Sequence, residues 1–371
     1  MSNPVSLRPW SRFRECLLRL RGRLTAKLLF NQRLNTWVYP AAESAPEPSP
    51  QDRYREFNRT YFAQFYEQEK MLADKPRMDF YHAAIARHIK PGDRVIDLGT
   101  GTGILAAFAS RRGAAQVYAI DHSVVLEHAK TLAAHNQIRN VEFIGTHSKD
   151  LKLDAPVDVI LHEQMGDYLF DEDMVANITD LRDRLLKPGG LILPSRFELF
   201  CEPVKVRDGR FVPYLWELNV HGIDYSCMER ERPQDPSYYH IPAADLHYVD
   251  YLLSDEEPVL TLDLQTVNPS EMPREIRFTR TIRRAGRLDG YMIYFRAKVD
   301  DDLTLNSSPL DPGRATNWGY RLLRTDHERF EADEVLEITL SVGNWAEVNS
   351  WRWKHVRQKP QAAGTVPAPL A

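Results

Sequence analysis

Residues 94–103 run Arg-Val-Ile-Asp-Leu-Gly-Thr-Gly-Thr-Gly, an apolar strand pattern that leads straight into a glycine-rich turn. A helix-like apolar stretch, 104–109, follows at once. Glycine tolerates positive φ angles and lets the backbone come close to a ligand, because it has no Cβ. A strand, a glycine turn and a helix in this order predict an α/β fold with a ligand at the carboxyl end of the strand.

A second strand pattern, Gln116–Ile120, is followed by Asp121, at a position where an acid can hydrogen-bond ribose hydroxyls. The glycine spacing is Gly-x-Gly-x-Gly, whereas dinucleotide sites carry Gly-x-Gly-x-x-Gly. This spacing favours an adenosyl ligand without a pyrophosphate, namely S-adenosylmethionine. A purely structural turn is the alternative, but the whole unit of strand, glycines, helix, strand and terminal acid favours nucleoside binding.

Two glutamates, Glu163 and Glu172, follow a third strand pattern, Val157–Leu161. Gly166 permits a turn between them, so a loop folded back on itself would bring both carboxylates to one pocket at the sheet edge. Such a pair would bind a cation, and a guanidinium fits best because its rigid fork of donors meets carboxylates two bonds at a time. Acidic pairs also hold metals, cap helices or face water, so the loop alone leaves these alternatives open.

Several motifs, in one order, resemble those of the protein arginine N-methyltransferases, a family of class I S-adenosylmethionine-dependent methyltransferases. The resemblance implies a Rossmann-like methyltransferase sheet followed by an antiparallel β-barrel domain with an inserted helical dimerisation arm, and a head-to-tail homodimer. The matching segments are the lid motif Tyr61–Phe65, Met71–Arg77, the double-glutamate loop with Met165 and Gly166, Leu186–Pro194, the loop Thr316–Trp318 and the arm Trp216–Ser226.

The resemblance also implies a role for each matching residue. Glu163 and Glu172 would be catalytic, holding a substrate guanidinium that stays protonated and must meet a sulfonium of the same sign. No metal is expected. The substrate would contact Met71, Asp74, Asn317 and Trp318, and the cofactor would contact Tyr61, Phe62, Arg77, Asp97, Gly99, Gly101, Gly103, Asp121 and Ser148.

The chain departs from the family pattern at several of these positions. Asn317 replaces a histidine that would pair with Asp74, so a hydrogen bond can persist while the charge is lost. Gln164 stands where close relatives carry Trp or Pro, and His162 stands where many carry Ser. These changes bear on substrate identity more than on reaction type.

Three functions are compatible with these motifs. The first is methyl transfer from S-adenosylmethionine to a guanidino nitrogen of arginine in protein substrates. The second is methylation of free arginine or another small guanidino metabolite. The third is an inactive scaffold that keeps the fold, which is disfavoured because both glutamates and Arg77 are present.

The composition fits an intracellular enzyme, and we expect a cytoplasmic location. The chain has 371 residues, 43% hydrophobic and 27% charged, which is enough for two domains with cores. Its formal net charge of −4 gives no global basic field, so direct nucleic-acid binding is not expected. Cys16, Cys201 and Cys227 form neither a disulfide framework nor a zinc pattern. No apolar stretch approaches the length of a membrane-spanning helix.

The chain is divided into four regions. A basic extension with a proline-rich linker covers 1–57, the S-adenosylmethionine-binding domain 58–194, the β-barrel domain 195–359 with the arm near 209–240, and a disordered tail 360–371. In the extension, leucines from Leu17 to Leu29 recur at roughly helical spacing. The simplest interpretation is a helix packed on the enzyme or its dimer mate. Contact with an anionic membrane, an acidic partner and organelle targeting are the alternatives.

Overall fold

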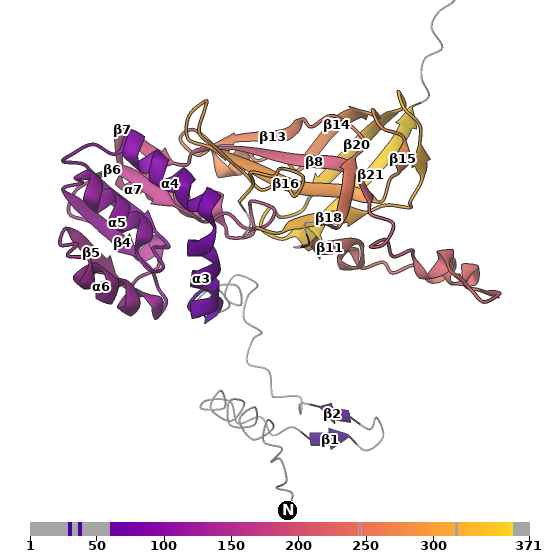
Figure 1. Ribbon diagram of the computed structural model, residues 1–371, viewed down its shortest axis with the longest axis horizontal. Coiled ribbons are helices and arrows are strands. Elements are labelled where there is room, and N and C mark those ends of the chain that lie inside the picture. The colour runs from indigo at the N-terminus through magenta and orange to yellow at the C-terminus, as the bar shows by residue number, and fades with distance from the viewer. Residues whose placement is uncertain are drawn as a thin grey trace, which may run out of the picture. The chain divides into compact units, whose positions relative to one another are not determined.

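The computed structural model describes residues 60–243, 245, 247–315 and 318–358, and the backbone of two short strands nearer the N-terminus (Figure 1). Strands β1 (Leu29–Asn31) and β2 (Thr36–Val38) pair antiparallel. Leu29 thus lies in a strand, although the leucine spacing predicts a helix there; the aromatic and β-branched residues nearby favour a strand. The rest of the 1–57 extension, the 360–371 tail and Asn317 lie outside the described residues.

A five-stranded parallel sheet forms the first half of the described chain. Nearly every residue of its central strands is buried, as expected for parallel strands covered on both faces. The spatial order is β5-β4-β3-β6-β7, so the turn after β3 and the loop after β6 leave the sheet at the same edge. The strands are β3 (Arg94–Leu98), β4 (Gln116–Ile120), β5 (Val141–Ile144), β6 (Val157–His162) and β7 (Leu186–Leu193).

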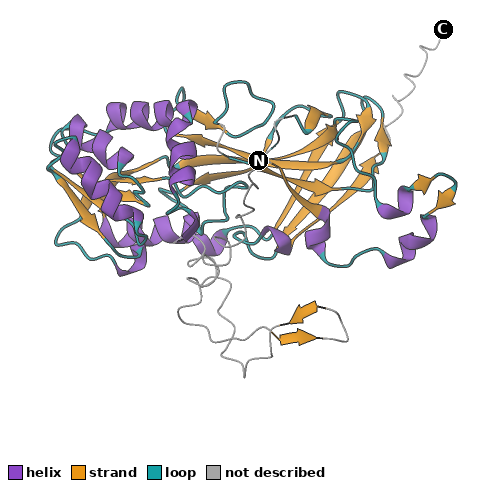
Figure 2. Ribbon diagram, turned by 60° about the horizontal axis from the view of Figure 1, so that its bottom comes forward, coloured by secondary structure: helices purple, strands orange, loops and turns teal. Residues whose placement is uncertain are grey.

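Helices flank this sheet (Figure 2). α5 begins after Gly103 (φ 83°) and ends before Gly113 (φ 102°), two left-handed positions that glycine occupies without strain. Among the described helices, none combines the length and apolarity needed to cross a bilayer. The helices are α3 (Phe65–Ala73), α4 (Lys75–His88), α5 (Ile104–Arg112), α6 (Val125–His135) and α7 (Met174–Leu185).

Antiparallel strands make up the second half, so the predicted order of a parallel sheet followed by antiparallel strands is confirmed. Seven strands form the main sheet: β8 (Arg196–Val206), β11 (His240–Ala243), β12 (Val249–Leu252), β13 (Pro258–Asp263), β16 (Gly290–Lys298), β17 (Thr304–Asn306) and β18 (Tyr320–Arg324). A second sheet has the order β14-β20-β21, with β14 (Glu275–Thr281), β20 (Val335–Val342) and β21 (Trp351–Gln358). A short pair joins β15 (Gly286–Arg287) and β19 (Arg329–Phe330).

One hydrophobic cluster runs through both halves, from Ile96 and Leu161 in the parallel sheet to Phe197 and Trp351 in the antiparallel strands. The two halves therefore share a core, which is packed across the junction between them. This junction positions the functional site, because residues of the antiparallel half reach the loop that follows β6.

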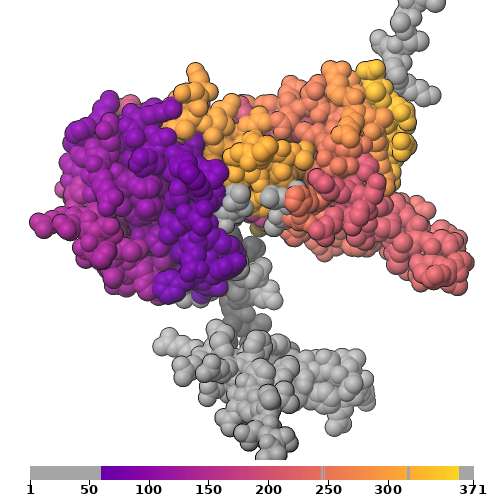
Figure 3. Space-filling model, in the orientation of Figure 1, coloured from indigo at the N-terminus to yellow at the C-terminus, as the bar shows by residue number. Residues whose placement is uncertain are grey.

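The arm between β8 and β11 contains three 3₁₀ helices and a β-hairpin, so its helical segments are of the 3₁₀ type and it has no α-helix. Its hairpin, β9 (Asn219–Val220) with β10 (Ile223–Asp224), turns at His221 (φ 53°) and Gly222 (φ 88°). Prolines at 233 and 236 further limit helix length. Figure 3 shows the arm projecting from the antiparallel half. The 3₁₀ helices are Leu215–Glu217, Ser226–Glu231 and Pro236–Tyr239.

Candidate active site

A cavity of about 150 Å³ opens at the carboxyl ends of β3, β4 and β6, where α3 and α4 meet the sheet. We call it the cofactor cavity. Of the predicted site residues, it is lined by Phe62, Met71, Arg77, Gly99, Gly101, Asp121, Ser148, Glu163 and Glu172. Its other lining residues are Gln68, Leu72, Met78, Tyr81, Leu98, Thr100, Thr102, Ile104, Leu105, Ile120, His122, Ser123, Thr146, His147 and Gln164.

The glycine turn forms one wall of the cofactor cavity. Gly101 has φ 53°, a left-handed conformation that favours glycine, and a Cβ on it would lie 3.0 Å from the Gln68 carboxamide oxygen. The Asp121 carboxylate accepts hydrogen bonds from the N–H groups of Gly101 (3.1 Å) and Ser123 (2.8 Å). Asp121 is therefore fixed at the cavity wall with its carboxylate beside the glycine turn.

Asp97 and Gly103 do not line the cavity, although both are predicted cofactor contacts. The Asp97 carboxylate lies under the turn, where it accepts hydrogen bonds from the Thr100 hydroxyl (2.6 Å) and the Ala106 N–H (2.9 Å). Burial raises the pKa of Asp97 to about 6. Asp97 thus ties the turn to the start of α5, and Gly103 supplies the left-handed residue before that helix.

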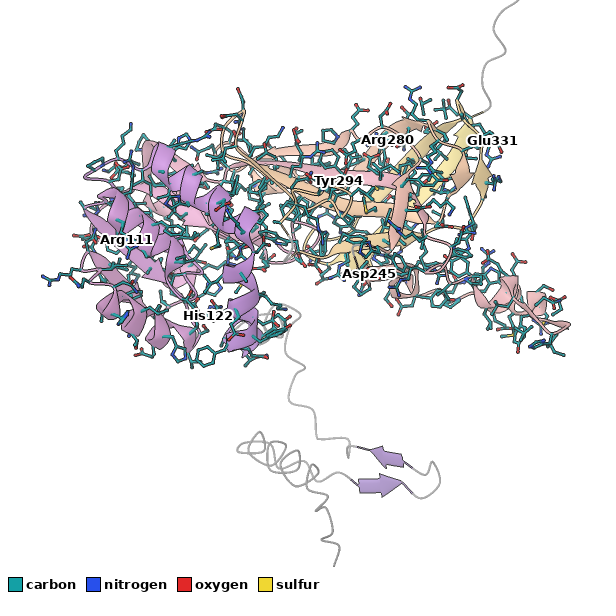
Figure 4. The ribbon with its side chains drawn as sticks, in the orientation of Figure 1. Arg111, His122, Asp245, Arg280, Tyr294 and Glu331 are labelled. Carbon is teal, nitrogen blue, oxygen red and sulfur yellow. The ribbon has the colours of Figure 1, made fainter. Side chains whose placement is uncertain are left out.

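The lid motif lies at the start of α3. Tyr61 and Phe62 precede this helix, which begins at Phe65; Phe62 lines the cavity and Tyr61 does not. The cavity residues that sequence reasoning missed include His122, directly after Asp121 (Figure 4), and His147, three residues after β5 ends at Ile144. Their rings lie 5.9 Å apart. Their position just beyond the carboxyl ends of neighbouring strands could have indicated from the sequence that they line the cavity.

The double-glutamate loop folds back as the sequence predicts. The Leu169 N–H donates to the Gly166 carbonyl (2.9 Å), and this tight turn returns the chain toward α7. Glu163 and Glu172 then line the same cavity. The turn brings together two carboxylates from opposite ends of the loop.

The two glutamates have different partners. Arg77 Nη2 lies 2.6 Å from Glu163 Oε2, and its guanidinium carbon lies 5.1 Å from the centroid of the Trp318 ring. Burial raises the pKa of Glu163 to about 7, although the Arg77 charge acts in the opposite direction. Within the described part of the chain, the Glu172 carboxylate has no ion pair or hydrogen bond. Burial raises its pKa well above the usual value, and the charges of Glu163 and Asp171 add to this.

The antiparallel half fixes the loop from the other side. The Trp318 Nε1–H donates to the Met165 carbonyl, and the Gly319 N–H donates to Asp167 Oδ1 (2.9 Å). Trp318 therefore supports the loop and Arg77, and it does not line the cavity itself. Asp74 also lies off the cavity wall, where its carboxylate caps α4 at the Arg77 N–H (3.4 Å).

His162 and Gln164, which depart from the family pattern, have different environments in the structure. His162 is buried, its Nε2–H donates to the Pro194 carbonyl (2.8 Å), and burial lowers its pKa to about 4, so the ring is neutral. Gln164 lines the cavity, and its Oε1 is enclosed without a hydrogen-bond partner among the described residues. His162 therefore has a structural place in the core, whereas Gln164 lies at the cavity wall.

This arrangement suits a cation held by carboxylates. The described residues contain no group of three or more His, Cys, Asp or Glu side chains able to hold a metal ion. The Glu172 carboxylate is partly buried and unpaired among the described residues, and a planar cation with several N–H donors would satisfy Glu172 and Glu163 together.

Comparisons with known proteins agree with this geometry. Residues 89–210 match a family described as a methyltransferase domain. Protein arginine N-methyltransferase 6 of Danio rerio is 38% identical over 284 residues, covering 73% of this chain and 78% of that protein. Protein arginine N-methyltransferase PRMT10 of Oryza sativa subsp. japonica is 30% identical over 293 residues, covering 70% and 76%.

Solved structures show the same fold. The Trypanosoma brucei PRMT1 enzyme-prozyme heterotetrameric complex with AdoHcy has a TM-score of 0.67 at 21% identity and covers 80% of this chain and 99% of that one. Protein arginine methyltransferase 10 of Arabidopsis thaliana has a TM-score of 0.65 at 23% identity, with 80% and 98% covered.

Proposed function

This chain belongs to the protein arginine N-methyltransferase family, and from that membership and the site geometry we propose that it transfers a methyl group from S-adenosylmethionine to a guanidino nitrogen of arginine in protein substrates. The observation that carries the proposal is the Glu172 carboxylate, which is unpaired in the described part of the chain and faces the same cavity as Glu163. A substrate guanidinium supplies the missing partner.

The residues present fit the cofactor. Gly101 leaves space that a side chain would partly fill, and Asp121 offers a carboxylate beside it for ribose hydroxyls. Arg77 offers a cation for the methionyl carboxylate. When bound, S-adenosylmethionine supplies an electrophilic methyl group on a positively charged sulfonium.

The glutamates orient the guanidinium and offset its repulsion from that charge. Their positions are fixed before substrate arrives, because β6, α7 and the Trp318 contact hold the loop. The guanidinium loses a proton during methylation. The Glu172 carboxylate is suited to accept this proton, because its raised pKa makes it a stronger base than an ordinary carboxylate.

We also propose that the protein forms a homodimer. The arm carries apolar side chains that face solvent in the single chain, Val220 (44% exposed) and Ile223 (63%). Apolar groups at the tip of a projecting arm gain stability when a second copy covers them. We therefore infer that the arm docks on another subunit.

Methyl transfer is tested with S-adenosylmethionine that carries a labelled methyl group. The acceptors are an Arg-Gly-rich peptide, the same peptide with Lys in place of Arg, and free arginine. We expect label in the arginine peptide alone, and we expect Glu172→Gln to lower turnover by about a hundredfold or more while calorimetry shows cofactor binding intact.

Asp79→Asn, which changes an exposed carboxylate on α4, is the matched control and should keep wild-type turnover. Preferential labelling of free arginine would favour the small guanidino substrate. Label in the lysine peptide, or full activity of Glu172→Gln, would rule out the guanidinium clamp.

A further inference from the structure

Strand β21 (Trp351–Gln358) lies at one margin of the three-stranded sheet β14-β20-β21. It pairs with β20 along its whole length, from Trp351 opposite Val342 to Gln358 opposite Val335. In the part of the chain that the structure describes, no strand pairs with its other margin. Such a margin carries unpaired N–H and C=O groups, which can take up an extended segment of another chain.

A second cavity, of about 480 Å³, lies against β21 and shares no lining residue with the cofactor cavity. Three parts of the fold line it: the first half of β21, the segment after β18, and the root of the arm. We call it the basic cleft. Its residues come from Arg352–His355, Arg324–Glu328 and Arg232–Tyr239, with Tyr214.

Cations outnumber free carboxylates in the basic cleft. Of its two carboxylates, Asp326 is paired with Arg232 at 3.0 Å, and Glu328 is shared by His355 at 3.7 Å and Arg357 at 3.5 Å. The other cations of the cleft, Arg324, Arg352 and Lys354, form no close ion pair with any described residue. The charge of Arg352 nevertheless helps to lower the pKa of the exposed Asp235 on the arm.

Aromatic rings hold part of this charge in place. The Arg324 guanidinium carbon lies 3.8 Å from the centroid of the Tyr214 ring, and that of Arg232 lies 4.8 Å from the Trp216 ring. Tyr214 and Trp216 are themselves stacked, with centroids 4.6 Å apart. Cations ordered before binding lose less freedom when a ligand arrives.

We propose that the basic cleft binds an extended acidic segment of the protein substrate, which adds to β21 as a further strand. This inference rests on the proposed function. Arg352 and Lys354 are two positions apart on β21, so they share one face, and both are exposed. A strand with an acid at every second position presents its carboxylates to them, while its backbone pairs with the free margin. Favoured substrates then carry an acidic stretch apart from the target arginine.

The test measures binding by fluorescence anisotropy, using a short labelled peptide in which Glu and Thr alternate. We expect binding that weakens as salt increases. The double substitution Arg352→Glu with Lys354→Glu should weaken it about tenfold or more. Arg111→Glu with Arg112→Glu, on α5 in the parallel half (Figure 4), makes the same charge change and should leave binding unchanged.

Three comparisons can overturn the proposal. A Lys-Thr peptide that binds equally would remove the charge complementarity. A Glu-Thr peptide with alternate backbone nitrogens methylated should bind weakly, and equal binding would exclude strand addition. Tighter binding of a thymidine oligonucleotide would make nucleic acid the ligand. Because the readout is binding, peptide binding without any methyl transfer would reject only the proposed function, and methyl transfer without peptide binding would reject only this inference.

Discussion

Glu163 and Glu172 illustrate how equal side chains acquire different properties from their surroundings. Arg77 forms an ion pair with Glu163 at 2.6 Å, whereas Glu172 forms no ion pair among the described residues, although the charge of Arg77 also acts on it. Burial raises the pKa of both carboxyls. The site therefore combines a carboxylate that is already paired with one that awaits a partner.

The pH dependence of catalysis should follow both glutamates. Burial raises the pKa of Glu163 to about 7 and also raises that of Glu172, and a protonated carboxyl cannot hold a cation. We expect kcat/KM for an arginine peptide to rise about tenfold per pH unit below about 7 and to continue rising above it until Glu172 is ionised as well. A rate profile at constant ionic strength checks this. A flat profile across that range would mean that Glu163 is already ionised.

The double-glutamate loop depends on one small residue at its turn. A Cβ on Gly166 would lie 1.5 Å from Asp171 Oδ1 and 2.0 Å from its Cγ, so Asp171 would have to move. Because Glu172 is the next residue, displacement of Asp171 also shifts one of the two candidate catalytic carboxylates. Gly166 is thus required by close packing within the loop.

Gly166→Ala should lower turnover about tenfold or more and destabilise the protein by about 1–3 kcal/mol, the usual range for overpacking. Steady-state kinetics and thermal unfolding measure the two effects. Adding Asp171→Ala should restore part of the stability, because it removes the clash. Gly209→Ala, whose Cβ would meet no atom within 4 Å, is the control. Wild-type turnover in Gly166→Ala would show that the loop adapts freely.

The two antiparallel sheets are joined by a buried ion pair. Arg280 on β14 (Figure 4) donates from Nε to Glu202 Oε2 (2.7 Å) and from Nη2 to Oε1 (2.8 Å), with Glu202 on β8. The Arg280 side chain is 4% exposed and that of Glu202 is 0%. Ser254 and the Glu257 N–H complete the carboxylate's hydrogen bonds.

Arg280→Met should lower the free energy of unfolding by about 3–5 kcal/mol, because it leaves the Glu202 charge buried without a partner. Denaturant unfolding measures the loss. Arg277→Met, on the same strand with a 69% exposed side chain, should change stability by about 0.5 kcal/mol or less. Equal effects of the two substitutions would contradict a special role for the buried pair.

At the scale of the whole molecule, the arm should govern assembly. Val220→Asp with Ile223→Asp places two charges on its apolar tip, and we expect the dissociation constant of the dimer to rise about tenfold or more. Sedimentation velocity measures this. Val356→Asp, at another 59% exposed apolar site, should leave association unchanged. A monomeric wild type, or an unaffected dimer, would reject the arm as the interface.

The sequence by itself determined the features that depend on neighbouring residues. The strand, glycine turn and helix of 94–109 and the two carboxylates of 163–172 are encoded within short stretches, because hydrogen-bonded turns and alternating burial are local properties. From these stretches alone the parallel sheet and its ligand edge could be predicted.

Only the tertiary structure decided which distant side chains meet. The Arg77–Glu163 pair and the Trp318–Met165 hydrogen bond, which spans 153 positions, join segments with no local signal for each other. Likewise, Asp97 is removed from the cavity by hydrogen bonds with Thr100 and Ala106. The basic cleft needs the arm, β18 and β21 together. Such contacts depend on the packing of the shared core. This packing sets the distances between residues far apart in the chain, which cannot be obtained from motif spacing or composition.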